Sequence, residues 1–315
     1  MVRLLAVLLL AGGSVKAQTI TQTFGSGADA FSIDFVEVGN PGNAADTTGS
    51  PNPVGSVPYV YNLGKFEVSR DMVLKASTAG GLGLTLEDIT NYGGNGANRP
   101  ATGVSWNEAA RFVNWLNTSK GYQAAYNFTT SGANDNITLW GAGLYTGSNP
   151  YRHKDAYYFL PSVNEWYKAA YGSPNGTFYN YPTAGDTIPT AVSGGTISGT
   201  AIYNGQNGPS DITNAGGLSG FGTMAQGGNV WEWTETAYWG VNNAADDARI
   251  LRGGSWVNDI TNLDALNLFG LFPNDETSFS PFIGFRVASV PEPSSLSLLL
   301  AGGAVFAAAR RRRLV

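Results

Sequence analysis

The chain of 315 residues contains no cysteine and a single histidine, His153. Without cysteine it has no disulfide, no thiolate ligand for zinc or an iron–sulfur cluster, and no thiol nucleophile. One imidazole excludes a histidine-rich metal site, and Ser219 and Ser255 have no base in their own motifs for a serine triad. His153 stands between Arg152 and Lys154, which indicates a solvated loop residue.

Acidic and basic residues are also scarce, at 13% of the chain against the usual ~25%. The formal net charge is −5 and the body offers no basic face, which argues against a nucleic-acid partner because phosphate binding needs one. Glycine, by contrast, reaches 42 residues, and aromatic residues make up 12% of the chain. Such a glycine content favours loops, turns and short strands over long helices.

The N-terminus, MVRLLAVLLLAGGSVKAQT, has the three parts of an export signal. Arg3 is followed by an apolar run over residues 4–10 and by the small-residue site Val15-Lys16-Ala17. This order predicts a signal peptide over residues 1–17, cleaved after Ala17. Residues 18–58 then hold an apolar strand segment at 31–38 and a loop rich in glycine, proline and asparagine.

The C-terminus, VPEPSSLSLLLAGGAVFAAARRRRLV, combines a Pro-Glu-Pro motif at 291–293, an apolar run over 296–309 and an arginine cluster at 310–313. This order resembles the PEP-CTERM sorting signal of Gram-negative bacteria that make extracellular polysaccharide. The resemblance implies that residues 290–315 anchor the chain transiently in the inner membrane by an apolar helix, until an exosortase removes them. A plain membrane anchor also fits this segment, and either would leave the body exported to the cell envelope or beyond.

Two helices are predicted from capping boxes, in which a serine side chain and a glutamate three residues later satisfy each other's backbone N–H groups. Ser105 and Glu108 begin the first, in PATGVSWNEAARFVNWLN (100–117), and Ser162 and Glu165 begin the second, in LPSVNEWYKAAYG (160–172). Alternating apolar residues predict further strands, at 59–68, 227–236, 249–256 and 283–289.

Five motifs in a fixed order resemble the formylglycine-generating enzyme, or sulfatase-modifying factor, family: VSWNEAARFVNWLN, LPSVNEWYKAA, GGNVWEWTE, LRGGSW and GFRVA. They define a domain over residues 59–289. The resemblance implies an α+β fold of the C-type-lectin-like, formylglycine-generating-enzyme type. Such a fold is loop-rich, with short twisted strands and two main helices.

In the enzymes of this family, two cysteines bind copper(I) and oxidise a substrate cysteine to formylglycine. The first lies three residues beyond Gly-Gly-Ser and the second five residues later, which places Asn258 and Leu263 at these positions. Neither side chain binds a soft copper ion or supplies a thiolate, so we expect no catalytic residue here. A related branch binds iron through several histidines of an added domain. A chain with one histidine cannot form such an iron site.

The resemblance also implies a calcium site around the motif GGNVWEW. The backbone carbonyls of Gly228 and Val230 and the side chain of Glu232 match its ligands, a set that suits a hard cation. The upstream acidic or amide ligand is replaced by Ala225. Alternatively, Glu232 is a partly buried acid bonded to backbone groups beneath the tryptophans. Calcium is the one cofactor that the sequence suggests.

Aromatic residues offer candidates for ligand binding. The tryptophans inside the five motifs are expected in the core, whereas aromatic residues near the lost catalytic cleft can expose a face that stacks on a sugar or a protein. Core packing is the competing interpretation for each of them. The ligand-binding candidates are Trp256, Trp239, Phe272 and Tyr238, with Phe269 beside them.

Two hypotheses of function follow. The first is an exported, non-catalytic binding or structural protein of the cell surface, whose partner is extracellular polysaccharide or another surface protein. Relatives in diversity-generating systems bind ligands between the motifs GGSW and GFR. The alternative is an enzyme of the same family with a metal-assisted site made of carboxylates such as Asp259, Asp264 and Glu232, which would require them to converge in one cleft.

Overall fold

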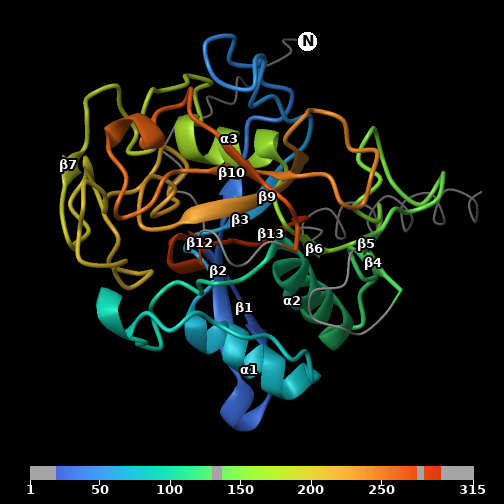
Figure 1. Cartoon of the computed structure of the whole chain (residues 1–315). Helices are drawn as coiled ribbons and strands as arrows, with labels where there is room; N and C mark the ends of the chain where they lie inside the picture. Colours follow the sequence, from blue (N-terminus) through green and yellow to red (C-terminus); the bar gives the residue numbers. More distant parts are fainter. Residues whose placement is uncertain (1–18, 130–136, 275–279, 292–315) are drawn as a thin grey trace, which may run out of the picture.

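The computed structural model describes residues 19–129, 137–274 and 280–291 (Figure 1). The predicted signal peptide and the apolar and arginine-rich part of the sorting segment lie outside these residues. Among the described residues, no helix is long and apolar enough to cross a membrane.

A five-stranded antiparallel sheet joins the beginning and the end of the body. Its order is β1 (Thr19–Phe24), β2 (Phe31–Val38), β3 (Tyr61–Gly64), β13 (Ala288–Ser289) and β6 (Tyr158–Phe159). The segment before residue 59 thus contributes β1 and β2 to the same sheet as β3.

A four-stranded sheet carries the motifs of the C-terminal half. Its order is β11 (Phe269–Leu271), β10 (Arg249–Arg252), β9 (Trp231–Ala237) and β12 (Ile283–Gly284), with β12 parallel to β9 and the other pairs antiparallel. Two small pairs complete the strands, β4 (Asn127–Phe128) with β5 (Ile137–Thr138) and β7 (Thr190–Ala191) with β8 (Thr200–Ala201).

The single strand predicted over residues 283–289 is divided between the two sheets. β12 pairs with β9, β13 pairs with β3, and residues 285–287 cross from one sheet to the other. The crossing is held by backbone bonds from Val68 N to Phe285 O at 2.9 Å and from Gly64 N to Val287 O at 2.7 Å. The alternating apolar residues continue through the crossing segment, since Phe285 and Val287 are both buried there.

Both predicted helices are confirmed, as α2 (Trp106–Ser119) and α3 (Val163–Tyr171), each with a complete capping box. A third helix, α1 (Arg70–Gly80), adds to the two that the sequence predicted. Ser69 caps it by accepting from Met72 N, but the third helical position holds methionine instead of glutamate, so the two-residue signature is absent.

Short 3-10 turns connect these elements, at η1 (Gly27–Asp29), η2 (Thr90–Tyr92), η3 (Ile260–Leu263) and η4 (Ser280–Phe282).

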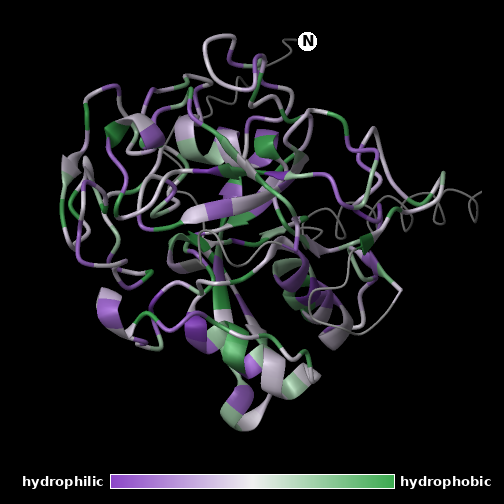
Figure 2. Cartoon of the chain, in the orientation of Figure 1, coloured by the Kyte–Doolittle hydropathy of each residue, from purple (hydrophilic) through white to green (hydrophobic). Residues whose placement is uncertain are grey.

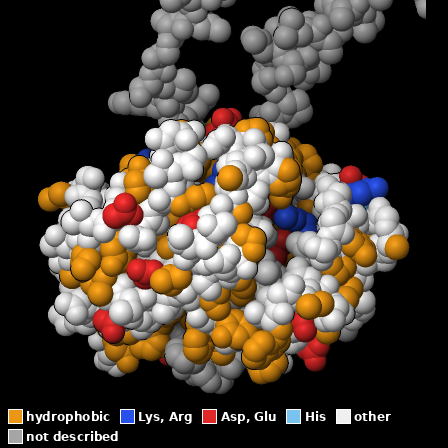
Figure 3. All heavy atoms as spheres, turned by 90° about the horizontal axis from the view of Figure 1, so that it is seen from above, with side chains coloured by type: hydrophobic (Ala, Val, Ile, Leu, Met, Phe, Trp, Pro, Cys, Tyr) orange, Lys and Arg blue, Asp and Glu red, His pale blue; other side chains and the backbone are white. Residues whose placement is uncertain are grey.

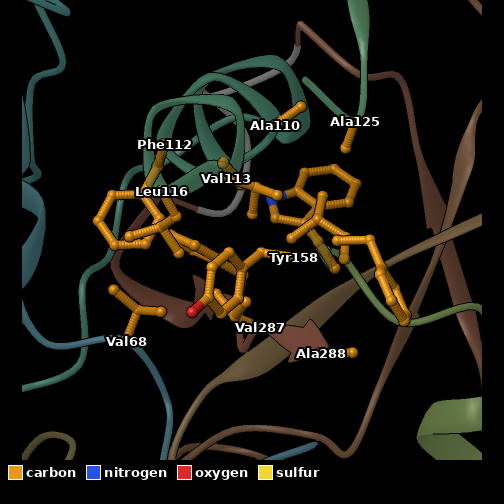
Figure 4. Packing of buried hydrophobic residues seen from close by; sticks show 14 of the residues in the cluster. Val68, Ala110, Phe112, Val113, Leu116, Ala125, Tyr158, Val287 and Ala288 are labelled. Carbon is orange, nitrogen blue, oxygen red and sulfur yellow. The ribbon is translucent and has the colours of Figure 1, made fainter. Parts of the chain in front are cut away.

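Helices α1 and α2 lie on one side of the strands and α3 on the other (Figure 1). Phe112, Val113 and Leu116 of α2 pack with Tyr158 of β6 and with Val287 (Figure 4). Along the surrounding loops, short hydrophobic stretches alternate with hydrophilic ones (Figure 2).

Candidate functional site

The segment after β10 occupies the place of the family's catalytic loop. The chain turns at Gly253 and Gly254, whose φ angles of 99° and 74° lie in the left-handed region that favours glycine. A Cβ at Gly254 would meet Leu263 Cδ1 at 3.0 Å, so the turn packs closely against η3. The glycine pair therefore fixes where residues 258–263 lie.

Both predicted cysteine positions are filled by structural side chains. Asn258 Oδ1 accepts from Ser255 N at 2.8 Å and from Ser255 Oγ at 2.7 Å, which closes the turn. Leu263 is fully buried and packs with Ala201 and Tyr203. A turn-closing amide oxygen and a core leucine thus stand where the family's enzymes have thiols.

Arg252 stabilises the part of this loop that follows η3. Its guanidinium is buried, donates to the carbonyls of Ala265 and Asn267, and lies 5.2–5.6 Å from the rings of three aromatic residues of α3. A cavity of about 340 Å³ remains beside the loop, lined by Tyr181, Ile260, Thr261, Asp264, Leu266 and Asn267.

The residues at the predicted calcium site do not fit calcium. Glu232 is fully buried, and Arg286 donates to it through Nε to Oε2 and Nη2 to Oε1, both at 2.5 Å. Trp166 Nε1 also donates to Oε2, at 2.6 Å. A guanidinium charge thus lies against both carboxylate oxygens and supplies the compensation that a cation would give. The carboxylate's partners are these side chains and not the backbone groups of the alternative interpretation.

The other members of that motif are buried around the same ion pair. Gly228, Val230 and Ala225 are buried, and Gly228 N donates to Gly253 O at 2.8 Å, which ties the motif to the catalytic-loop turn. Within the described residues, no group of three or more His, Cys, Asp or Glu side chains gathers as a metal site.

Sequence reasoning missed Glu67, which lies in the same buried region. Asn229 Nδ2 donates to Glu67 Oε2 at 2.6 Å. Burial, and then the neighbouring Glu232 charge, raise the pKa of Glu67 well above its usual range. The only sequence signal was an acid within the apolar stretch FEV, between β3 and α1.

The carboxylates of the alternative enzyme hypothesis have separate local roles. Asp259 caps η3 by accepting from Thr261 N at 3.0 Å, and Asp264 accepts from Leu266 N at 2.8 Å. Glu232 instead pairs with Arg286. The structure therefore shows two loop-closing acids and one buried ion pair.

The aromatic candidates divide into one buried and several exposed residues. Trp256 is only 4% exposed and packs against Tyr92 and Phe282, with ring centroids 5.2 and 5.3 Å away. The expectation that it presents a free face is corrected, because the ring lies in a buried hydrophobic cluster, and its backbone N donates to Asn229 O at 2.9 Å. Trp239 is 75% exposed.

The remaining aromatic candidates lie around the edge of the four-stranded sheet. Phe272 is 59% and Phe269 is 39% exposed. Tyr238 is half-buried, and its ring covers Gly270, where a Cβ would meet it at 2.3 Å. Together with Trp239, these residues place aromatic surface at the end of β9 and on β11.

A larger cleft, of about 720 Å³, was not predicted from the sequence. Its walls are residues 58–59, the segment 146–149, the N-terminus of α3 and the loop 240–242, and Arg152 lies in it. The face seen from above is hollowed, with basic and acidic side chains together in the hollow (Figure 3).

Arg152 bridges two buried carboxylates in this cleft. Its Nη1 lies 3.2 Å from Glu165 Oε1 and its Nε lies 3.3 Å from Glu235 Oε2. Tyr59 donates its hydroxyl to Glu165 at 2.8 Å, and Tyr126 donates to Glu235 at 2.6 Å. Burial raises the pKa of Glu235 to about 7, against the attraction of the Arg152 charge.

His153, beside this arginine, is buried and not solvated. It is 7% exposed, and its ring packs edge-on against Trp140 with centroids 4.7 Å apart. The charged residues on either side of His153 favoured a solvated loop, but the ring is covered by Trp140, and His153 N donates to Ala125 O at 2.8 Å.

The fold and the site define a lectin-like, loop-rich α+β protein of the formylglycine-generating type that has no thiol at the two catalytic positions. The chain belongs to the family of sulfatase-modifying factor enzyme 1-like domains, whose profile matches residues 6–290. A PEP-CTERM protein-sorting motif matches residues 289–313, which confirms the predicted signal and implies exosortase processing, export and sorting to the envelope.

Two curated relatives match part of the chain. The "Inactive C-alpha-formylglycine-generating enzyme 2" of Mus musculus is 31% identical over 133 residues, and that of Bos taurus is 32% identical over 134 residues. Each match covers 41% of this chain and 42% or 43% of the relative, so the chain spans less than half of their length.

Solved structures share the fold. Treponema denticola variable protein 1 has a TM-score of 0.60 at 19% identity, covering 87% of this chain and 99% of its own. CarF has 0.59 at 20%, covering 82% and 99%, and PvdO from Pseudomonas aeruginosa has 0.53 at 17%, covering 86% and 98%. At these identities the likeness concerns the fold alone, and it confirms the predicted class.

Proposed function

We propose that the chain is a non-catalytic binding or structural protein of the cell surface or the extracellular polysaccharide matrix. The observation that carries this proposal is the occupation of the two catalytic positions by Asn258, which closes a turn, and Leu263, which is buried. A copper-dependent thiol oxidation has no ligand at either position.

The sorting motif and the relatives support the same function. A PEP-CTERM motif directs a protein to the envelope, where extracellular polysaccharide and other surface proteins are the available partners. The curated relatives are named as inactive formylglycine-generating enzymes. A scaffold that keeps its fold and has lost its catalytic groups is suited to binding.

The absence of catalysis is tested with the purified full-length chain, copper(I) and a peptide that carries a substrate cysteine. An aldehyde-reactive hydrazide reports formylglycine, and a family enzyme with both cysteines serves as the positive control. We expect no aldehyde above background. Aldehyde formed by this chain would overturn the non-catalytic part of the proposal.

Binding is tested by co-sedimentation of the full-length chain with polysaccharide from the producing organism. Saturable co-sedimentation supports a matrix protein. If the polysaccharide does not bind but cross-linking on intact cells joins the chain to one surface protein, the partner is that protein. If the chain neither co-sediments with the polysaccharide nor cross-links to a surface protein, in cells that make both partners, the proposed binding function is overturned.

A further inference from the structure

We infer that the 720 Å³ cleft at Arg152 is a binding site for an uncharged saccharide segment. This inference rests on the proposed binding function and names its site and ligand class. The cleft shares no lining residue with the cavity beside the family's cysteine positions. The ligand site would therefore differ from the place where the family's enzymes do their chemistry.

The size of the cleft and its fixed walls suit a small ligand or one short stretch of a chain. Its volume falls within the ~300–1,000 Å³ that is usual for small-molecule sites. Asn242 joins two walls, since its Oδ1 accepts from Ala237 N at 2.8 Å and its Nδ2 donates to Asn149 Oδ1 at 3.1 Å. Asn149 Nδ2 in turn donates to Glu235 at 2.8 Å.

The polar groups of the lining match sugar hydroxyls. Amides and hydroxyls both donate and accept hydrogen bonds, as does each sugar hydroxyl. Asn164, exposed at the N-terminus of α3, accepts from Gly55 N at 2.9 Å through Oδ1, and its Nδ2 has no partner within the described residues. The other amide and hydroxyl side chains of the lining are Tyr59, Thr146, Ser148, Ser162 and Thr236, together with Asn149 and Asn242, which bond to each other.

The charge of the cleft favours an uncharged ligand. Arg152 is its basic residue, and Glu165 and Glu235 lie within 3.2 and 3.3 Å of the guanidinium. Both carboxyl groups are at most 1% exposed and face the guanidinium, and one carboxylate charge is enough to compensate the arginine before any ligand arrives. Neither a phosphate nor a uronate finds an unpaired cation here, and the chain's net charge of −5 disfavours an anionic chain further.

Aromatic side chains beside the cleft provide stacking surfaces. Tyr59 is part of the lining and is 44% exposed. Trp239, 75% exposed, directly precedes the wall formed by residues 240–242. Sugar rings present apolar C–H faces, which aromatic rings bind when their polar edges stay wet. Amides, a compensated charge and exposed rings together characterise a saccharide site better than a nucleotide or peptide-terminus site.

The test uses the full-length chain and a set of neutral oligosaccharides of glucose, mannose, galactose and N-acetylglucosamine, with oligogalacturonate as the charged comparison. Calorimetry measures binding, and the organism's own polysaccharide is measured in parallel by co-sedimentation. Two variants address the cleft. Ser148→Trp fills it from an exposed position, and Asn164→Asp keeps the acceptor for Gly55 N while removing the free donor.

Leu266→Trp is the matched control, because it introduces the same side chain at an exposed position in the 340 Å³ cavity. We expect at least one neutral oligosaccharide to bind, at least tenfold more weakly with Ser148→Trp and about fivefold more weakly with Asn164→Asp. Leu266→Trp should leave the affinity unchanged, and melting temperatures should show that all variants fold.

The outcomes separate this inference from the proposed function. If Ser148→Trp leaves binding of the organism's polysaccharide intact, the cleft is not the binding site, but the proposed binding function stands. Stronger binding of oligogalacturonate than of every neutral probe would overturn the ligand class. Failure to bind the organism's polysaccharide and every oligosaccharide would overturn the inference and leave the proposal with a protein partner only.

Discussion

At the scale of the residue, the protein is distinguished by the side chains that lie at the family's cysteine positions and at the predicted calcium site. Asn258 and Leu263 hold the catalytic loop by a turn and by core packing, and Arg286 neutralises Glu232. Each of these side chains is bonded or packed into the local structure, so changing it is expected to alter the stability of the fold.

Leu263→Ala should lower the free energy of unfolding by ~2–5 kcal/mol, because it leaves a cavity in a fully buried position. Urea denaturation measures the effect. Leu266→Ala, three residues later and 63% exposed, should change the free energy by less than ~0.5 kcal/mol. Equal effects of the two variants would contradict the assignment of Leu263 to the core.

Arg286→Met should lower the free energy of unfolding by ~3–5 kcal/mol, since it leaves the buried Glu232 carboxylate without its cation. For the same reason, millimolar calcium or a chelator should leave the melting temperature of the unaltered chain unchanged. A calcium-dependent rise in melting temperature would show that the ion pair does not substitute for a bound cation.

At the scale of the element, short helices owe their position to their first turn. Ser105 Oγ accepts from Glu108 N at 3.1 Å, and Glu108 Oε2 accepts from Ser105 N at 2.9 Å. These bonds satisfy backbone donors that a helix start leaves unpaired. The same arrangement at Ser162 and Glu165 orients the end of α3 that lines the cleft.

Ser105→Ala should cost ~1 kcal/mol of stability through loss of the N-cap. Thr118→Ala, on the exposed last turn of the same helix, serves as the control, because the hydroxyl that it removes donates only to carbonyls within the helix and accepts from no backbone N–H of the first turn. Thermal melts of both variants measure the difference. A cost at Thr118 as large as at Ser105 would argue against the capping role.

At the scale of the whole molecule, polar groups far apart in the sequence meet in buried networks. Arg152 contacts Glu165, 13 residues away, and Glu235, 83 residues away. Arg286 reaches Glu232, and its Nη1 also donates to Gly64 O, 222 residues distant. These contacts link both sheets and α3 into one unit, so the titration of one group affects the stability of the whole fold.

Stability should fall as the pH rises from about 5 to 8. Burial raises the pKa of Glu235 from 4.5 to about 7, with Glu165 adding to the rise and Arg152, Tyr126 and Asn149 opposing it. Between these pKa values the folded state binds more protons than the unfolded state, so its advantage is complete below pH 4.5 and lost above pH 7. The loss is at most about 3 kcal/mol.

Melting temperatures across this pH range measure the slope. Glu235→Gln should flatten it, while Glu67, whose pKa is also raised by burial, sustains part of the slope. Asp246→Asn, at an exposed position, should leave the slope unchanged. A melting temperature that increases from pH 5 to pH 8 in the unaltered chain would contradict the protonation of Glu235.

Local signals in the sequence predicted the local structure. The capping boxes predicted α2 and α3, an apolar segment predicted β2, and strand-like apolar stretches predicted β9 and β10, because these patterns depend on residues within one or two turns or a single strand. Helix α1 was missed because Met72 replaces the glutamate of the box. The order of five motifs then gave the family and the fold class.

The sequence by itself determined that this chain has no cysteine thiol of its own and that it carries a sorting motif. Only the tertiary structure decided that His153 and Trp256 are buried, that Glu232 pairs with Arg286, and that a cleft forms at Arg152. The physical reason is distance along the chain. Burial and charge pairing depend on groups tens to hundreds of residues apart, which no local pattern records.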